Sequence, residues 1–245
     1  MKNLLFSALM LFSTAAVISC STDPDPDPSQ PSGAMVPKKI ERSYSQNYPV
    51  STITYTYDGN KLKEINLNPQ YDVSKVKFTY TGDNITKMEL FSGVNFTPYT
   101  NYDIEYQNDK MVKYSATYNG TTTVRNYTHH SDGTITTDNV SNSYMKFTTS
   151  NGNITKIESF SNGAVTSTNN FTFDDKNNIH KNITGLNKII ELERLVWDLT
   201  QVNTNNKLSD DSGNNTYTYE YNSDNFPTKS IKTQGTSTTT SVITY

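Results

Sequence analysis

The chain has 245 residues, with 21 basic and 24 acidic side chains that give a net charge of −3. A mean hydropathy of −0.68 and a hydrophobic content of 33% indicate a thin core. The chain has no basic stripe, which argues against nucleic-acid binding, and its single cysteine excludes a disulfide framework. Disorder is the simplest alternative for so polar a chain. The 17 tyrosines recur in a regular order, however, and favour folded β structure.

The first 19 residues have the layout of a bacterial export signal. Lys2 precedes an apolar stretch, residues 4–18, that is shorter than the roughly 20 residues of a membrane span. It ends in VISC at residues 17–20, which resembles the lipobox of bacterial lipoproteins. The resemblance implies removal of residues 1–19 and acylation of Cys20, and several acyl chains give durable anchoring. An ordinary secretory signal cut nearby is the alternative.

Residues 20–35 are predicted to connect the lipidated Cys20 to the folded domain. Asp and Pro alternate over residues 23–28. Proline fixes φ and lacks an N–H, and aspartate stays solvated, so this stretch is expected to be a stiff tether. Acidic residues after the cysteine also resemble the surface-export signal of Bacteroides-type lipoproteins, and a plain spacer is the alternative. We therefore expect a cell-envelope protein held at the outer membrane by its lipid, facing the surface or the periplasm.

Residues 36–245 are predicted to form a single repetitive β domain. Each repeat has an alternating aromatic strand, then a polar turn rich in Gly, Asn and Asp, then an apolar residue. The repeats follow one another at about 23 residues. Clear copies occupy residues 53–62, 77–85, 103–111, 145–154, 170–179 and 218–226, and weaker copies occupy 126–135 and 201–208.

The strand pattern in each repeat predicts a β-hairpin. Ile53, Tyr55 and Tyr57 alternate with threonines, so a period of two places them on one face. The turn needs positive φ, which Gly59 and its equivalents supply. About eight such hairpins predict an all-β, antiparallel up-and-down meander. The meander is expected either to close as a barrel or to coil as an open sheet. Closure would pair the last strand, 241–245, with the first.

Residues 186–197 interrupt this pattern, because they lack turn residues and contain the only tryptophan, Trp197. Leu186, Ile189 and Ile190 lie along one side of a helix, but Glu193 interrupts the stripe. A pair of buried strands and a short plug helix remain equal alternatives. Trp197 is the one candidate ligand-binding side chain. A buried position in the plug is the alternative for it.

Two families resemble this pattern. The motif at residues 55–60, YTYDGN, resembles the YD-repeat proteins, which build β-shells. A family of Bacteroides lipoproteins of unknown function, described as having a porin-like fold, is similar over residues 36–245. That similarity includes the apolar interruption at 179–186. It implies a barrel and no activity. Membrane-embedded strands need an apolar outward band, whereas these strands alternate Tyr with Thr, Lys, Glu and Asn, so we expect a soluble, porin-like barrel.

The motif search finds no basis for catalysis. The chain contains no HExxH, CxxC, P-loop or GxSxG motif, so we predict no catalytic residue, no metal site and no cofactor. His129 and His130 are adjacent, so on a strand they point to opposite faces and cannot chelate one metal together. The aspartate pairs 174–175 and 210–211 are expected to be exposed turn carboxylates, with a weak calcium site as the alternative. The alternating tyrosines are expected to form the core face, with hydroxyls reaching solvent.

These observations predict a lipid-anchored envelope protein without enzymatic activity. The leading hypothesis is a binding or interaction module for glycans, other nutrients or an envelope protein, in contact with the membrane through its lipid. A structural or adhesive surface protein is the alternative. A glycan-processing hydrolase is the second alternative, and it would require a cleft holding two converging carboxylates.

Overall fold

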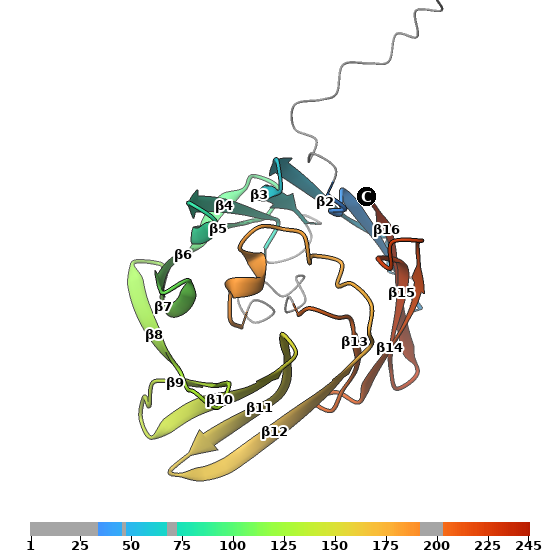
Figure 1. Cartoon of the computed structure of the whole chain (residues 1–245). Helices are drawn as coiled ribbons and strands as arrows, with labels where there is room; N and C mark the ends of the chain where they lie inside the picture. The colour runs from blue at the N-terminus through green and yellow to red at the C-terminus, as the bar shows by residue number, and fades with distance from the viewer. Residues whose placement is uncertain (1–33, 46–47, 68–72, 192–202) are drawn as a thin grey trace, which may run out of the picture.

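The described part of the chain is a closed β-barrel. The computed structural model describes residues 34–45, 48–67, 73–191 and 203–245. Over these residues, sixteen strands pair antiparallel with their neighbours in sequence. β1 (Lys39–Tyr44) pairs with β16 (Ser237–Thr244) and closes the barrel (Figure 1). In this pair Ile40 lies opposite Ile243. The predicted all-β meander of about eight hairpins is therefore confirmed, and closure by the last strand against the first is confirmed with it.

The strands occur in the same order as the sequence repeats, and consecutive strands pair with each other. Between β1 and β16 they are β2 (Ser51–Asp58), β3 (Lys61–Asn66), β4 (Lys75–Thr81), β5 (Asn84–Ser92), β6 (Thr97–Gln107), β7 (Lys110–Tyr118), β8 (Thr121–His129), β9 (Thr134–Thr137), β10 (Ser143–Ser150), β11 (Asn153–Ser161), β12 (Ala164–Phe173), β13 (Lys207–Asp210), β14 (Asn215–Tyr221) and β15 (Pro227–Gln234).

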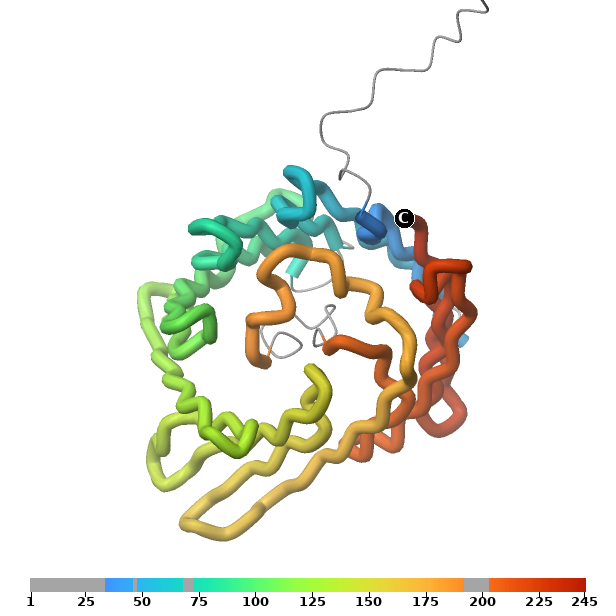
Figure 2. Tube along the Cα trace, in the orientation of Figure 1, coloured from blue at the N-terminus to red at the C-terminus, as the bar shows by residue number. Residues whose placement is uncertain are grey.

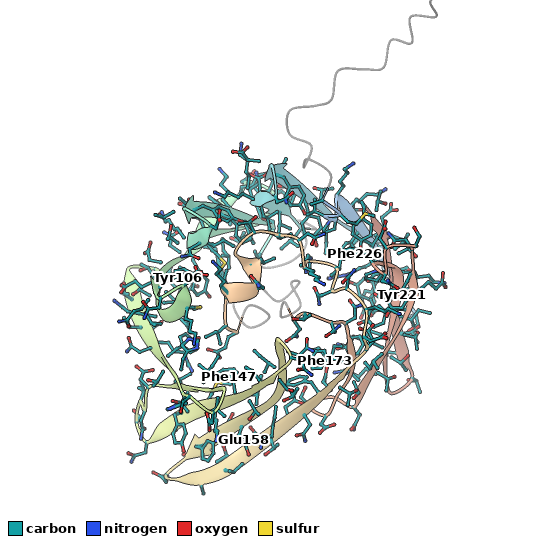
Figure 3. The ribbon with its side chains drawn as sticks, viewed as in Figure 1. Tyr106, Phe147, Glu158, Phe173, Tyr221 and Phe226 are labelled. Atoms are coloured by element: carbon teal, nitrogen blue, oxygen red, sulfur yellow. The ribbon has the colours of Figure 1, made fainter. Side chains whose placement is uncertain are left out.

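The period of two sorts side chains between the lumen and the outside. On β2, Ser51, Ile53, Tyr55 and Tyr57 are buried and the residues between them are exposed. Phe147 on β10 is fully buried on the inner side (Figure 3). The buried tyrosines form a core face, as predicted, but the hydroxyl of Tyr57 does not reach solvent. The Tyr57 hydroxyl donates to the Pro37 carbonyl over 2.7 Å in a buried hydrogen bond.

The outer face of the barrel is polar and carries ion pairs between neighbouring strands. Three of these pairs are Lys75–Glu64 at 3.3 Å, Lys113–Glu105 at 2.6 Å and Lys229–Glu220 at 2.7 Å. The partners in each pair belong to adjacent strands and project away from the lumen. A lipid-facing band would place apolar side chains at these positions.

Successive repeats are tied together by side chains at equivalent positions. Tyr80 Oη accepts from the Leu62 N–H at 3.0 Å, and the Tyr106 hydroxyl donates to the Ile85 carbonyl at 2.9 Å. Tyr80 and Tyr106 each lie at a register shift in their hairpin. A bulge bends its strand locally and re-aims the side chain. The bulges therefore direct these side chains toward the preceding repeat.

A plug folds back into the lumen between β12 and β13 (Figures 1 and 2). We use the name plug for the described residues 174–191 and 203–206. Its contacts run along the turns at one end of the barrel: the Thr184 N–H donates to the Asn60 carbonyl at 3.0 Å, and Lys188 Nζ donates to Asp109 Oδ1 at 2.6 Å. This end is therefore covered by the plug.

Of the stretch 186–197, for which buried strands and a short helix are the predicted alternatives, the structure describes 186–191, and three of these residues are helical. Leu186–Lys188 form the 3-10 helix η1, whereas Ile189 is extended. Ile183, Leu186, Ile189 and Ile190 join the hydrophobic core of the strands. Residues 192–197 lie outside the described residues. No helix in the described part of the chain is long and apolar enough to cross a membrane.

Candidate functional site

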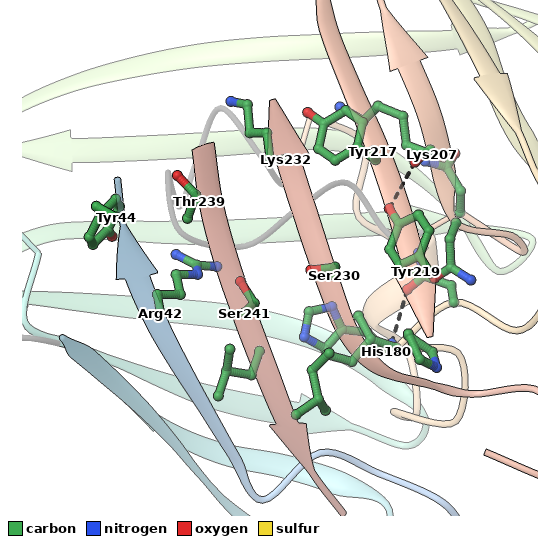
Figure 4. Close-up of a pocket in the computed structure, with 17 residues that line it drawn as sticks. Arg42, Tyr44, His180, Lys207, Tyr217, Tyr219, Ser230, Lys232, Thr239 and Ser241 are labelled. Carbon is green, nitrogen blue, oxygen red and sulfur yellow. Dashed lines mark hydrogen bonds between the residues drawn. The ribbon is translucent and has the colours of Figure 1, made fainter. Parts of the chain in front are cut away.

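Two cavities lie between the barrel wall and the plug. The first has a volume of about 270 Å³ and is bounded by strands β13–β16, strand β1 and the plug (Figure 4). The second, of about 270 Å³, lies against strands β10–β13. Asn203 and Lys207 line both cavities, so the two are neighbours. An engineered apolar cavity of roughly 150 Å³ already holds benzene, so each cavity has room for a small organic molecule.

The strand register places polar side chains in rows across the wall of the first cavity. Lys232 on β15 lies opposite Tyr217 on β14 and Thr239 on β16. Ser230 is paired in the same way with Tyr219 and Ser241, and Ser241 is paired with Arg42 on β1. All of these residues line the cavity. Here serine, threonine, lysine and arginine occupy inward positions, whereas the inward positions of β2–β5 hold mainly aliphatic and aromatic residues.

His180 is the plug residue with the most unusual environment. It is 2% exposed and lines the first cavity. Its Nε2 lies 3.2 Å from the Tyr55 hydroxyl, and its Nδ1 has no hydrogen-bond partner. Burial, together with the nearby Arg42 charge, lowers the pKa of His180 to about 3, so the ring is neutral near pH 7. An unpaired buried polar atom costs roughly 1–3 kcal/mol.

The tyrosines beside His180 present rings, because their hydroxyls are engaged. The Tyr219 hydroxyl donates to the Lys207 carbonyl at 2.8 Å, and the Tyr217 hydroxyl donates to Asp210 Oδ2 at 3.0 Å. Burial raises the pKa of Tyr219, with a further contribution from the charge of Asp174, so Tyr219 stays protonated. Ring faces suit the apolar face of a sugar or another flat ligand.

A buried ion pair separates the two cavities. Lys207 Nζ lies 3.6 Å from Asp210 Oδ2, and both side chains are nearly inaccessible. Burial alone would raise the Asp210 pKa, but hydrogen bonds from Asn215, Ser212 and Tyr217 and the charge of Lys207 together lower it. The expectation that Asp210 is an exposed turn carboxylate is wrong, because Asp210 is 5% exposed and points inward.

The other aspartate of the predicted pairs that faces inward is Asp174. It accepts hydrogen bonds from Asn206 Nδ2 at 3.1 Å and from the Tyr221 hydroxyl. Its neighbour Asp175, like Asp211, is exposed as predicted. Among the described residues, no three His, Cys, Asp or Glu side chains gather as a metal site would require.

The second cavity brings two carboxylates to one wall, which is the feature that the hydrolase hypothesis requires. Glu191 and Asp210 both line it. Glu191 accepts from the Tyr127 hydroxyl at 2.5 Å and lies 3.8 Å from Arg125 Nε. A glycosidase needs one acid with a raised pKa. The Asp210 pKa is lowered instead, and its carboxylate accepts hydrogen bonds from Asn215, Ser212 and Tyr217.

The structure locates only some of the residues selected from the sequence. Cys20 and Trp197 lie outside the described residues, so lipidation and a ligand role stay predictions. His129 and His130 contact different partners, as expected from opposite faces: the Met111 carbonyl at 2.8 Å and Thr136 Oγ1 at 2.9 Å.

Sequence reasoning missed His180 and the cationic wall. The signal for His180 was its place in the apolar interruption of the repeats. The signal for Lys232 was its position in β15, two residues from Ser230 and therefore on the same face.

Comparisons with known proteins support the fold alone. No protein family profile matches the chain, and no curated protein matches it significantly by sequence. The chain is similar to the crystal structure of a porin-like protein from Bacteroides uniformis, with a TM-score of 0.50 and 13% identity, over 85% of this chain and 97% of that one. A porin-like protein from Bacteroides vulgatus aligns with a TM-score of 0.39 and 12% identity, over 86% and 99%. The first comparison supports the predicted porin-like barrel.

Proposed function

We propose that the chain is a non-enzymatic module of the cell envelope that binds a small molecule in the lumen of its barrel. The observation that carries the proposal is the first cavity, which combines about 270 Å³ of space with a buried, unpaired His180 Nδ1 and the rings of Tyr217 and Tyr219. A barrel filled only by its own side chains would leave neither the space nor an unpaired polar atom. Pockets that bind ligands commonly pair aromatic walls with a few polar groups.

The proposal is tested by filling the cavity. Ser241 faces the lumen, and the adjacent Val242 is exposed on the outer face of the same strand. We expect Ser241→Trp to abolish the hits of a ligand-observed NMR screen of small polar molecules, and Val242→Trp to retain them. Circular dichroism establishes that both variants are folded. A screen without hits on the wild-type chain, or hits that survive Ser241→Trp, would contradict luminal binding.

We also propose that the module is tethered to the membrane through Cys20. Support comes from the start of the described chain: Asn182 Nδ2 of the plug donates to the Met35 carbonyl at 3.0 Å. The tether would then leave the barrel at its plugged end and direct the other end away from the membrane. The polar outer wall fits a barrel that stands in water. Metabolic labelling with a fatty acid is expected to mark the wild-type chain and to leave Cys20→Ser unlabelled.

The absence of enzymatic activity is part of the proposal, and it rests on the partners of Glu191 and Asp210 in the second cavity. We expect no turnover of a panel of chromogenic glycosides by the wild-type chain. Turnover that is lost in both Glu191→Gln and Asp210→Asn would favour the hydrolase instead.

A structural or adhesive role has its own supporting observation at the end of the barrel away from the plug. Most exposed large hydrophobic side chains lie in or close to the turns of that end. They include Tyr48, Val50, Val94, Phe96, Tyr99, Tyr118, Val140 and Val165. Exposed apolar patches often mark interaction surfaces. If this end mediates self-assembly, sedimentation velocity will show oligomers that Val94→Asp with Phe96→Asp dissociates and that Val242→Asp, a substitution near the plugged end, leaves intact.

A further inference from the structure

We infer that the first cavity selects a small anionic ligand that carries hydroxyl groups, of the class of a sugar acid, with the ligand's carboxylate next to Lys232. This inference rests on the proposed luminal binding and adds the chemistry of the ligand to it.

The charge of the cavity wall supports this inference. The described lining includes Arg42, Lys207 and Lys232 and no Asp or Glu. Lys207 is matched by Asp210 at 3.6 Å. Lys232 forms no ion pair within the described part of the chain, whereas Lys229 on the same strand pairs with Glu220 at 2.7 Å. Lys232 therefore gives the wall a positive charge that no carboxylate of the described residues offsets, and such a charge favours a ligand of the opposite sign.

Hydrogen-bonding groups lie beside this charge. Ser230, Thr239 and Ser241 project into the cavity from β15 and β16. In the view of Figure 4, Ser230 and Ser241 lie between Lys232 and His180. Neighbouring strands are about 4.8 Å apart, so one small polyol can span hydroxyls on both strands. His180 adds one buried nitrogen without a partner. A ligand with several hydroxyls satisfies these groups, and an apolar ligand would leave them unpaired.

The size and closure of the cavity limit the size of the ligand. Its volume of about 270 Å³ suits a molecule of roughly monosaccharide size. The plug crosses the lumen and is held to the turns at Asn60 and Asp109. A polymer therefore has no straight path through the barrel, and the ligand is expected to be a monomer or the end of a short chain. The rings of Tyr217 and Tyr219 supply the apolar wall that a pyranose ring requires.

The experiment compares an acidic and a neutral sugar on charge variants of one strand. Isothermal titration calorimetry is carried out with D-glucuronate and with D-glucose on the whole chain. The variants are Lys232→Gln, Lys232→Arg and, as the matched control, Lys229→Gln on the outer face of the same strand. We expect the wild-type chain and Lys229→Gln to bind D-glucuronate at least tenfold more tightly than D-glucose. We expect Lys232→Gln to lose that preference and Lys232→Arg to keep it.

The possible outcomes distinguish the anion inference from the proposed luminal binding. Equal affinity for both sugars, unchanged in Lys232→Gln, would overturn the anion inference and leave luminal binding standing. The NMR screen could also yield neutral ligands that Ser241→Trp abolishes, while D-glucuronate fails to bind. That result too would overturn the anion inference and leave luminal binding standing. Absence of every ligand in both experiments would overturn the inference and the proposed function together. Thermal melts of the lysine variants establish that a loss of binding does not reflect unfolding.

Discussion

The buried imidazole of His180 links the candidate site to the acid stability of the barrel. Its folded-state pKa, about 3, lies below the unfolded value of 6.5. The unfolded chain therefore takes up this proton first as the pH falls. Protonation of His180 in the unfolded chain therefore destabilises the folded state at low pH, and this destabilisation disappears above pH 6.5. The free energy of unfolding should fall between these two pKa values by up to about 1.4 kcal/mol per pH unit from this group.

We expect His180→Phe to flatten this acid dependence. Urea unfolding at a series of pH values between 4 and 7 measures it, and His130→Gln is the control for loss of an exposed histidine. A variant that keeps the wild-type slope would show that the ring is already charged or hydrated in the folded chain.

Gly185 permits a close approach of the plug to the turn between β4 and β5. Its φ is 74°, and a Cβ atom there would lie 2.4 Å from the Asp83 carbonyl oxygen. Gly235 has a similar φ of 58° and open space around it. Gly235→Ala should lower the free energy of unfolding by about 1 kcal/mol, because alanine is unfavourable in the left-handed backbone conformation. Gly185→Ala should lower it by roughly 1–3 kcal/mol more, because its Cβ would also collide with the Asp83 carbonyl. Chemical denaturation measures both variants, and an equal decrease in the free energy of unfolding would show that the plug does not pack as described.

At the scale of elements, the tyrosines at the bulges connect hairpins to one another and to the plug. Tyr80 accepts from the Leu62 N–H and donates to the Thr184 carbonyl, whereas Tyr106 makes one such bond. A typical hydrogen bond contributes about 1 kcal/mol net. We expect Tyr80→Phe to lower the free energy of unfolding about twice as much as Tyr106→Phe, and the exposed Tyr118→Phe to have no effect. An equal response of all three variants in urea unfolding would contradict this role.

The hairpins were predictable from sequence and the plug was not, for the same physical reason. Alternation as in residues 53–57 is a local signal, because each strand pairs with the next along the chain. The plug depends on contacts such as Thr184 with Asn60, which are far apart in sequence and leave no periodic trace. Its three-residue helix is also too short to produce a stripe. Only the interruption of the repeats indicated that something other than a hairpin occupies this stretch.

At the scale of the whole molecule, closure of the barrel removes the exposed edges that an open meander would leave. The closing seam offers a direct test: Ser43 on β1 lies opposite Thr240 on β16. Directly paired residues of this kind have Cα atoms about 5.5 Å apart, within disulfide range. In a Cys20→Ser background, Ser43→Cys with Thr240→Cys should form an intramolecular disulfide and raise the melting temperature. Free thiols under oxidising conditions would indicate an open sheet.

The candidate site was less predictable than the barrel around it. Pattern and period assign Tyr217, Tyr219 and Lys232 to one face of the sheet, but they do not reveal that this face borders a cavity. That depends on how far the plug fills the lumen. The partner of His180 Nε2, Tyr55, lies 125 positions away in sequence, so the unpaired Nδ1 becomes visible only in three dimensions.

The most direct test of a ligand site in the lumen is the nitrogen NMR spectrum of the imidazole rings. The chain has three histidines, so the signals of His129, His130 and His180 can be assigned by single substitutions. Addition of D-glucuronate to saturation is expected to shift the Nδ1 signal of His180 and to leave the other two rings unchanged. A His180 spectrum that does not respond to any ligand found by the NMR screen would contradict the account.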